Sequence, residues 1–273
     1  MKGRNSTFKD LDALTTSLEG RPILSIDLIR VSPENLVACI GDTAGAVSLW
    51  ILPGMITIDR EFIYPLPVGP LNKLQCHQMG ANCVALKNIK CFKVNGDAIT
   101  EKFHLILASG GDDQGVSCSI IEIEICKSDA SNRVFNFIGG VLARESSASA
   151  IKGIKIIDRS AGVLNIYTVG YDQRLTLWSV DLPTLSRSSK TSLKFLSSAP
   201  VDIFDVNCLD TCLLIENELS IEYLVVGGQG LELFSFDPNP LLAAQALKKS
   251  NYLLVTCGAG KSNGETRYSI SPS

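Results

Sequence analysis

Residues 168–178 read Thr-Val-Gly-Tyr-Asp-Gln-Arg-Leu-Thr-Leu-Trp, and this stretch decides the fold. An apolar run over residues 166–169 meets a turn that contains Gly170 and Asp172, and a second alternating run ends at Trp178. Short β-branched runs separated by such turns are typical of all-β proteins. The stretch therefore predicts two antiparallel strands joined by a tight turn.

The same strand–turn–strand pattern occurs three more times, with second strands that end at Trp50, Ser119 and Phe234. We predict an apolar strand before each pair, at 23–29, 83–89, 151–157 and 201–208, and a weaker strand after the first three pairs, near 56–63, 134–138 and 192–196. Three inner strands and a ragged outer strand are the anatomy of a propeller blade. The sequence therefore predicts an all-β chain of about four β-propeller blades.

The domain organisation follows from this pattern. We expect an N-terminal extension over residues 1–19, a blade region over 20–237, and a divergent, poorly ordered tail over 238–273 with a possible short helix at Pro240. The predicted blades lie at about 20–65, 77–140, 149–197 and 200–237. Four blades is the lower end of the propeller range, and open blade edges are a liability. We therefore expect an incomplete or open propeller, from the C-terminal part of a longer protein or from a truncated gene product.

Composition limits the classes of function. The chain has 273 residues, 45% of them hydrophobic and 19% charged, so it can bury a sizeable core. Its net charge of −3 with scattered Lys and Arg gives no basic stripe for gripping nucleic acid alone. Nine cysteines without a C-x-x-C pair, and only two histidines, argue against a zinc site or a disulfide framework. Without a signal core or a long apolar run, we expect a cytoplasmic protein with no membrane contact.

The spacing of particular residues resembles that of the WD-repeat family. In that family a Ser or Thr on the second strand lies four residues before a turn Asp, which lies six residues before a Trp. The third predicted blade matches this spacing in full, with Thr168, Asp172 and Trp178. The second matches its Ser–Asp part with Ser109 and Asp113, and His77 occupies the place of the family's upstream His. The resemblance implies a structural relay of hydrogen bonds, which rigidifies a fold when every member is satisfied. The relay residues are His77, Ser109, Asp113, Thr168, Asp172 and Trp178.

None of the four predicted blades carries every relay member. Ser119 stands at the Trp place of the second blade, and the third blade has no His between residues 145 and 150. Ala44 stands at the Asp place of the first blade and Gly228 at that of the fourth. These gaps weaken the relay but leave the strand pattern intact.

Two strings narrow the resemblance. Residues 172–178 and 227–233 resemble the last blades of the WD-repeat-containing protein 6 family, and the stretch from His77 to Gly110 is similar to the preceding blade. The similarity covers about residues 20–236 and implies a C-terminal fragment of that family. Its members are large cytoplasmic proteins that partner a tRNA ribose 2′-O-methyltransferase acting on the wobble nucleotide, and they carry no methyl-transfer chemistry. The resemblance thus implies a non-catalytic scaffold that contacts tRNA indirectly, through the complex.

Other interpretations remain open. A generic protein-interaction propeller in signalling or trafficking needs only the blades. Gln173 and Arg174 lie in a turn where a blade does not demand them, so they form either a solvated turn or an interaction site.

An enzyme is disfavoured. The string Gly-Ala-Gly-Lys-Ser at 258–262 lacks the first glycine of a phosphate loop, because Val255 stands there. Asp112 and Asp113 are explained as turn residues. No Ser or Cys nucleophile with an orienting acid is recognisable around His77. We therefore expect no catalytic site, no metal, no cofactor and no small-molecule substrate.

Overall fold

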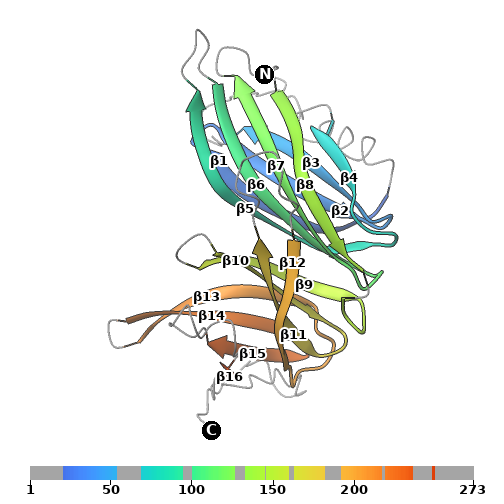
Figure 1. Ribbon diagram of the computed structural model, residues 1–273. Helices are drawn as coiled ribbons and strands as arrows, with labels where there is room; N and C mark the ends of the chain where they lie inside the picture. Colours follow the sequence, from blue (N-terminus) through green and yellow to red (C-terminus); the bar gives the residue numbers. More distant parts are fainter. Residues whose placement is uncertain are drawn as a thin grey trace, which may run out of the picture. The chain divides into compact units, whose positions relative to one another are not determined.

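The computed structural model describes residues 21–53, 69–94, 100–126, 133–144, 146–159, 163–181, 192–216, 219–235 and 248–249. Within these ranges the chain forms only strands, which make four four-stranded antiparallel sheets (Figure 1). In all four sheets each strand pairs with the strand that precedes or follows it in the sequence. The predicted fold class is confirmed in its architecture: the described residues are all-β and form four sheets with the four-stranded, sequence-ordered topology of propeller blades.

The chain divides into two compact units. The first unit, Met1–Asp113 with Ser117–Leu142, holds the first two blades. The first blade consists of β1 (Ile23–Ser32), β2 (Asn35–Asp42), β3 (Ala46–Pro53) and β4 (Asn72–Gln75). The second consists of β5 (Ala81–Val94), β6 (Thr100–Gly111), β7 (Val116–Cys126) and β8 (Arg133–Ala143).

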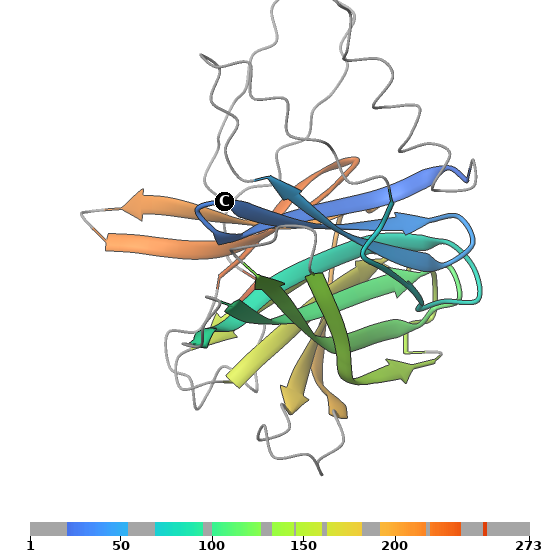
Figure 2. The same ribbon diagram turned by 90° about the horizontal axis from the view of Figure 1, so that it is seen from above.

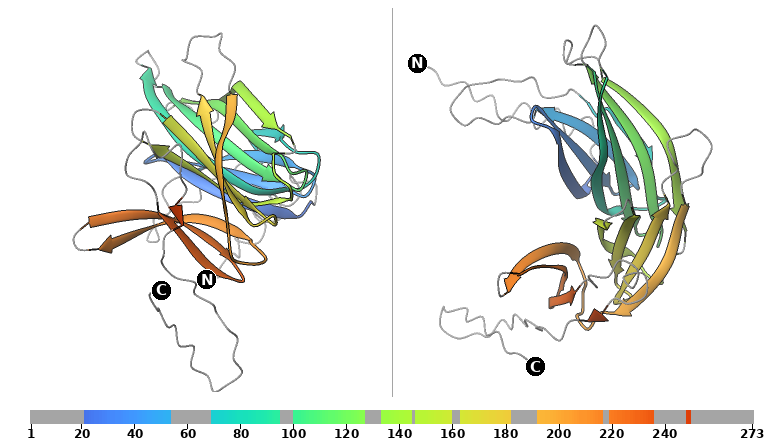
Figure 3. Two further views of the ribbon diagram at one scale, coloured as in Figure 1. Left: turned by 60° about the horizontal axis from the view of Figure 1, so that its bottom comes forward. Right: turned by 60° about the vertical axis from the view of Figure 1, so that its left-hand side comes forward.

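The second unit, Gln114–Val116 with Ala143–Ser273, holds the other two blades. The third blade consists of β9 (Ile151–Arg159), β10 (Val163–Gly170), β11 (Arg174–Asp181) and β12 (Ser192–Pro200). The fourth consists of β13 (Cys208–Glu216), β14 (Leu219–Gly228), β15 (Gly230–Ser235) and β16 (Lys248–Lys249), and Figure 3 shows β13 and β14 as a long orange pair.

Each unit has a core between its two blades. In the first unit the blue and teal strands are stacked (Figure 2), and Val37 and Cys39 of β2 share one buried cluster with Leu105 and Leu107 of β6. In the second unit the corresponding cluster joins β10 to β14. Alternate residues of each strand point to the same face, so the period of two seen in the sequence becomes an apolar face. Burial of that face drives the pairing of the blades.

Two strand predictions are wrong. The outer strand of the first blade is β4, which pairs with β3 through Leu49↔Asn72, whereas the predicted segment 56–63 lies outside the described residues. The first strand of the fourth blade is β13 rather than 201–208. Residues 201–207 form a loop whose apolar side chains at 201, 203 and 206 are buried, so the loop mimics the alternation of a strand.

The predicted extension at 1–19 and the helix at Pro240 lie outside the described residues, and of the tail only β16 is described. The domain boundaries therefore stay a prediction. Among the described residues, no helix is long and apolar enough to cross a membrane. Within the same ranges, no three His, Cys, Asp or Glu side chains gather as metal ligands would.

Candidate functional site

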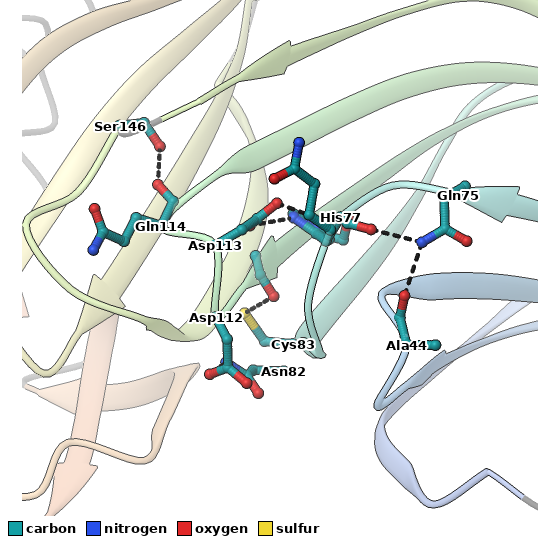
Figure 4. Close-up of polar contacts among 12 residues, drawn as sticks. Ala44, Gln75, His77, Asn82, Cys83, Asp112, Asp113, Gln114 and Ser146 are labelled. Carbon is teal, nitrogen blue, oxygen red and sulfur yellow. Dashed lines mark hydrogen bonds and ion pairs between the residues drawn. The ribbon is translucent and has the colours of Figure 1, made fainter.

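The second blade holds a hydrogen-bonded chain of His77, Ser109 and Asp113. His77 lies in the segment between β4 and β5, Ser109 lies near the end of β6, and Asp113 lies in the following turn. The His77 Nδ1 atom is 2.9 Å from Asp113 Oδ1, and Nε2 is 2.8 Å from Ser109 Oγ. Because a carboxylate only accepts, Nδ1 carries a proton, and in the neutral ring Nε2 accepts from the Ser109 hydroxyl. Figure 4 shows His77 directed at Asp113.

Local geometry fixes this His ring in place. The Gln78 amide donates to Asp113 Oδ2 at 3.0 Å, which holds the second carboxylate oxygen. A Cβ atom on Gly111 would lie 2.6 Å from the His77 ring, so only glycine leaves room for the imidazole there. The ring is thus held by two hydrogen bonds and by the close approach of the β6 backbone.

These contacts are the same as those of a Ser–His–Asp catalytic triad. The sequence assigned His77, Ser109 and Asp113 to a structural relay, and the structure brings the three side chains together. Accessibility decides what the triad can do. Ser109 is 0% exposed and His77 is 2% exposed, whereas a nucleophile has to meet its substrate. In this conformation the three residues tie the turn to the sheet.

The third blade divides the same relay into two parts. The Trp178 indole Nε1 donates to Thr168 Oγ1 at 3.0 Å in a buried position. Asp172 Oδ2 accepts from Ser147 Oγ at 2.8 Å and from the Ala148 amide at 3.2 Å. Ser147 therefore stands where His77 stands in the second blade, but its hydroxyl is too short to connect Asp172 with Thr168.

A second repeated contact, here called the latch, joins each turn to the segment that precedes the next blade. In the first turn the Gly45 carbonyl accepts from the amides of Cys76 (3.1 Å) and His77 (3.0 Å). The side-chain amide of Gln75 adds a bond to Ala44 O at 2.8 Å and one to His77 O (Figure 4). Gly45 has a φ of 81°, a conformation that favours glycine.

Glutamine holds the corresponding place in the next two turns. The Gln114 carbonyl accepts from Ser146 N at 3.0 Å and Ser147 N at 3.3 Å, and the Gln173 carbonyl accepts from Val201 N at 2.8 Å. Their φ values are 62° and 55°, and such a backbone is costly for a residue with a side chain. The latch persists at all three turns despite that cost.

The latch shows which residues sequence reasoning missed. It aligns Ser147 with His77, and no residue spacing in the sequence gives this alignment because the intervening loops differ in length. In the first blade, buried Asp42 replaces the missing turn Asp, since its Oδ1 accepts from Ala44 N (2.9 Å) and Ala46 N (3.0 Å). The signal for Asp42 was its place two residues before Ala44, in the manner of an Asx turn.

Gaps in the relay have visible causes. Trp50 matches Trp178, but the residue ten before it is Ile40, so the buried Trp50 Nε1 has no hydrogen-bond partner among the described residues. A Cβ atom on Gly228 would lie 2.5 Å from the Phe204 carbonyl oxygen, which leaves no room for an Asp in the fourth blade.

The predicted interaction turn is partly structural. Gln173 Nε2 donates to Ile203 O at 3.0 Å, so this half-buried side chain holds the loop before the fourth blade. Arg174 is exposed, and its Nε and Nη2 donate to Ser198 Oγ at 3.0 and 2.6 Å.

Two exposed aromatic residues are connected with this turn. One is next to it in the sequence, and the other follows the residue that accepts the Gln173 hydrogen bond. Tyr171 is 53% exposed, with Lys152 Nζ 4.9 Å from the centre of its ring. Phe204, next to Ile203, is 66% exposed.

A charged group on the second blade surrounds Glu122. His104 Nε2 lies 2.8 Å from Glu122 Oε2, Asn136 donates to Oε1 at 3.0 Å, and Lys102 Nζ is 3.8 Å from Oε1. Burial raises the pKa of Glu122, but the hydrogen bonds and the positive charge outweigh it and hold the pKa below its ordinary value. The hydrogen bond to Glu124 raises the pKa of Lys102. The charges of this group are paired with one another and with Glu124, which is the character of a structural network.

Known proteins that are similar to this chain are found among the solved structures. No known protein-family profile matches the chain, and no curated protein matches it. Among solved structures it is similar to a chain of polycomb repressive complex 2 from Chaetomium thermophilum, at 10% identity over 80% of this chain and 55% of that chain, with a TM-score of 0.31. It is also similar to the β-propeller domain of Cps50 (Swd1) from Myceliophteria thermophila, at 12% identity over 82% and 72%, with a TM-score of 0.27.

The chain thus spans a little over half of the length of the polycomb chain. The assignment of the fold rests on the strand order and the hydrogen bonds described above.

Proposed function

We propose that the chain is a non-catalytic, cytoplasmic WD-repeat scaffold whose protein partner is a tRNA ribose 2′-O-methyltransferase acting on the wobble nucleotide. The observation that carries the proposal is the turn at Asp172, Gln173 and Arg174, which opens the string 172–178, one of the two that resemble a methyltransferase-partner family. In the latch the Gln173 carbonyl accepts from the Val201 amide at 2.8 Å, and Arg174 in the same turn is exposed. Loop residues held by a rigid scaffold often carry binding.

The charge of the chain agrees with an indirect contact to tRNA. A net charge of −3 gives no general attraction to phosphates, and a protein that grips nucleic acid alone usually needs a basic surface. The enzyme would then supply most of the tRNA contacts, and the scaffold would hold the enzyme.

The experiment is co-purification of the methyltransferase with the tagged protein from cells, together with mass spectrometry of wobble ribose methylation. We expect Arg174→Ala to lower the amount of co-purified methyltransferase. Lys194→Ala is the matched control, because Lys194 is an exposed cation on β12 of the same blade. Wobble methylation that stays unchanged after deletion of the gene would contradict the proposal.

A second candidate is a general protein-interaction propeller in signalling or trafficking. It is favoured by the exposure of Tyr171 and Phe204, because aromatic residues are enriched where proteins bind one another. A partner screen that returns other proteins but never the methyltransferase would select this second candidate.

A further inference from the structure

The latch residues give a register for comparing the first two blades. In the first blade Ile26 pairs with Ile40, which lies five residues before the turn residue Gly45. In the second blade Val84 pairs with Ser109, which lies five residues before Gln114. Ile26 and Val84 therefore occupy the same place on the innermost strands of their blades.

Two residues further along, Leu28 and Leu86 are equivalent in the same way. Leu28 pairs with Ala38, and Leu86 pairs with Leu107, each two residues before the partners just named. In the third blade the same register selects Ile154.

Equivalent places differ sharply in exposure. Ile26 is 65% exposed and Leu28 is 50% exposed, whereas Val84 is 8% exposed and Leu86 is 7% exposed. The third blade agrees with the second, since Ile154 is 5% exposed. Among the described residues, no segment packs over this side of β1 in the first blade, whereas the equivalent side is buried in the second and third blades.

In the second blade, the first blade packs against this side of β5. Val84 and Leu86 belong to a buried cluster that includes Val37 and Cys39, with Ile29 packed against it. The contact also has polar bonds at its edge.

Two bonds from β1 complete that contact. Ser25 Oγ donates to Ala81 O at 2.9 Å, and Asp27 Oδ2 accepts from Leu86 N at 2.7 Å. This side of an inner strand is therefore packed against the surface of another blade. That surface has an apolar centre and a short polar rim.

We infer that Leu24, Ile26 and Leu28, here called the open β1 face, dock a blade of a second copy of this chain. The three side chains alternate along β1, are 41–65% exposed and carry no charge. The next residue on this side of the strand is the exposed Arg30, whose guanidinium donates to Pro33 O at 3.0 Å, at the far end of the strand. The required occupant is a blade, and every copy of the chain carries blades. The inference does not depend on the proposed function.

The size of the face sets the strength of the contact. A stable dimer buries about 800 Å² on each partner, and three partly exposed aliphatic side chains supply only part of that area. Self-association is therefore weak and depends on concentration.

The experiment measures the mass of the full chain in solution by light scattering over a wide range of concentrations. We expect the mass to rise from 29.4 kDa toward twice that value as the concentration increases. The double variant Ile26→Lys with Leu28→Lys should stay at the single-chain mass, because it places charge on the open β1 face. Both residues are half exposed or more, so the fold tolerates the change, and circular dichroism verifies this.

The matched control is Val134→Lys with Ile138→Lys, which changes two exposed aliphatic residues on β8. This variant should associate as the unaltered chain does. A chain that keeps the single-chain mass at every concentration would overturn the inference. Equal association of the β1 and β8 variants would overturn it too.

Discussion

Trp50 and Trp178 hold the same place in their blades but differ in what the indole N–H contacts. Trp178 donates to Thr168, whereas Trp50 faces Ile40, with which it shares a buried cluster. A buried donor without a partner costs about 1–3 kcal/mol. The residue ten positions before the Trp thus decides whether the indole N–H has a hydrogen-bond acceptor.

We therefore predict that Ile40→Thr gives a more stable protein than Ile40→Val, by about 1 kcal/mol in the free energy of unfolding. Thr and Val have the same shape, so the difference isolates the hydroxyl. Urea unfolding measures it. In the third blade Thr168→Val should lower stability by a similar amount, and equal stabilities of the two Ile40 variants would refute the prediction.

The buried triad makes a chemical prediction. A fluorophosphonate probe, which reacts with activated serine, should not label Ser109 in the folded chain, because the hydroxyl is 0% exposed. Mass spectrometry of the treated protein checks this. Labelling that disappears in a Ser109→Ala variant would instead revive an enzymatic role.

At the level of the elements, close approach of backbone and side chain holds each turn in place. Gly111→Ala should destabilise the chain by about 1–3 kcal/mol, since the new methyl group meets the His77 ring at 2.6 Å. Gly69→Ala is the control, because nothing lies within 4 Å of a Cβ atom there. Thermal unfolding of both variants tests the prediction, which fails if the two changes have equal effects.

The sequence predicted the strands and turns well where the period of two continues up to a Gly or Asp turn, as it does between Ile166 and Trp178. It failed at residues 201–207, where buried apolar side chains alternate in a loop. It also missed Ser147 and Asp42. Their roles depend on the alignment of segments separated by loops of unequal length, and only the three-dimensional register supplies that alignment.

For the whole molecule, stability should fall in acid partly through Glu122. The pKa of Glu122 lies below its ordinary value in the folded chain. Its carboxylate therefore stabilises the fold above the unfolded-state pKa of about 4.3, and this contribution is lost as the pH falls through the folded-state value.

We expect Glu122→Gln to reduce the drop in melting temperature between about pH 6 and about pH 3, because the variant has no such carboxylate to protonate. Glu34→Gln, at an exposed position in the β1–β2 turn, is the control and should leave the drop unchanged. Calorimetry at a series of pH values measures the effect. A Glu122→Gln curve parallel to that of the unaltered chain would contradict it.

The carboxylate of Asp27 has a consequence for how such a chain can change over evolution. One oxygen accepts from the neighbouring Leu28 amide at 2.9 Å and the other from Leu86 in the next sheet. Deleting the segment that encodes the first sheet would leave the Leu86 amide without its acceptor. Loss of the first repeat by recombination therefore carries the cost of this unpaired donor unless another acceptor replaces Asp27.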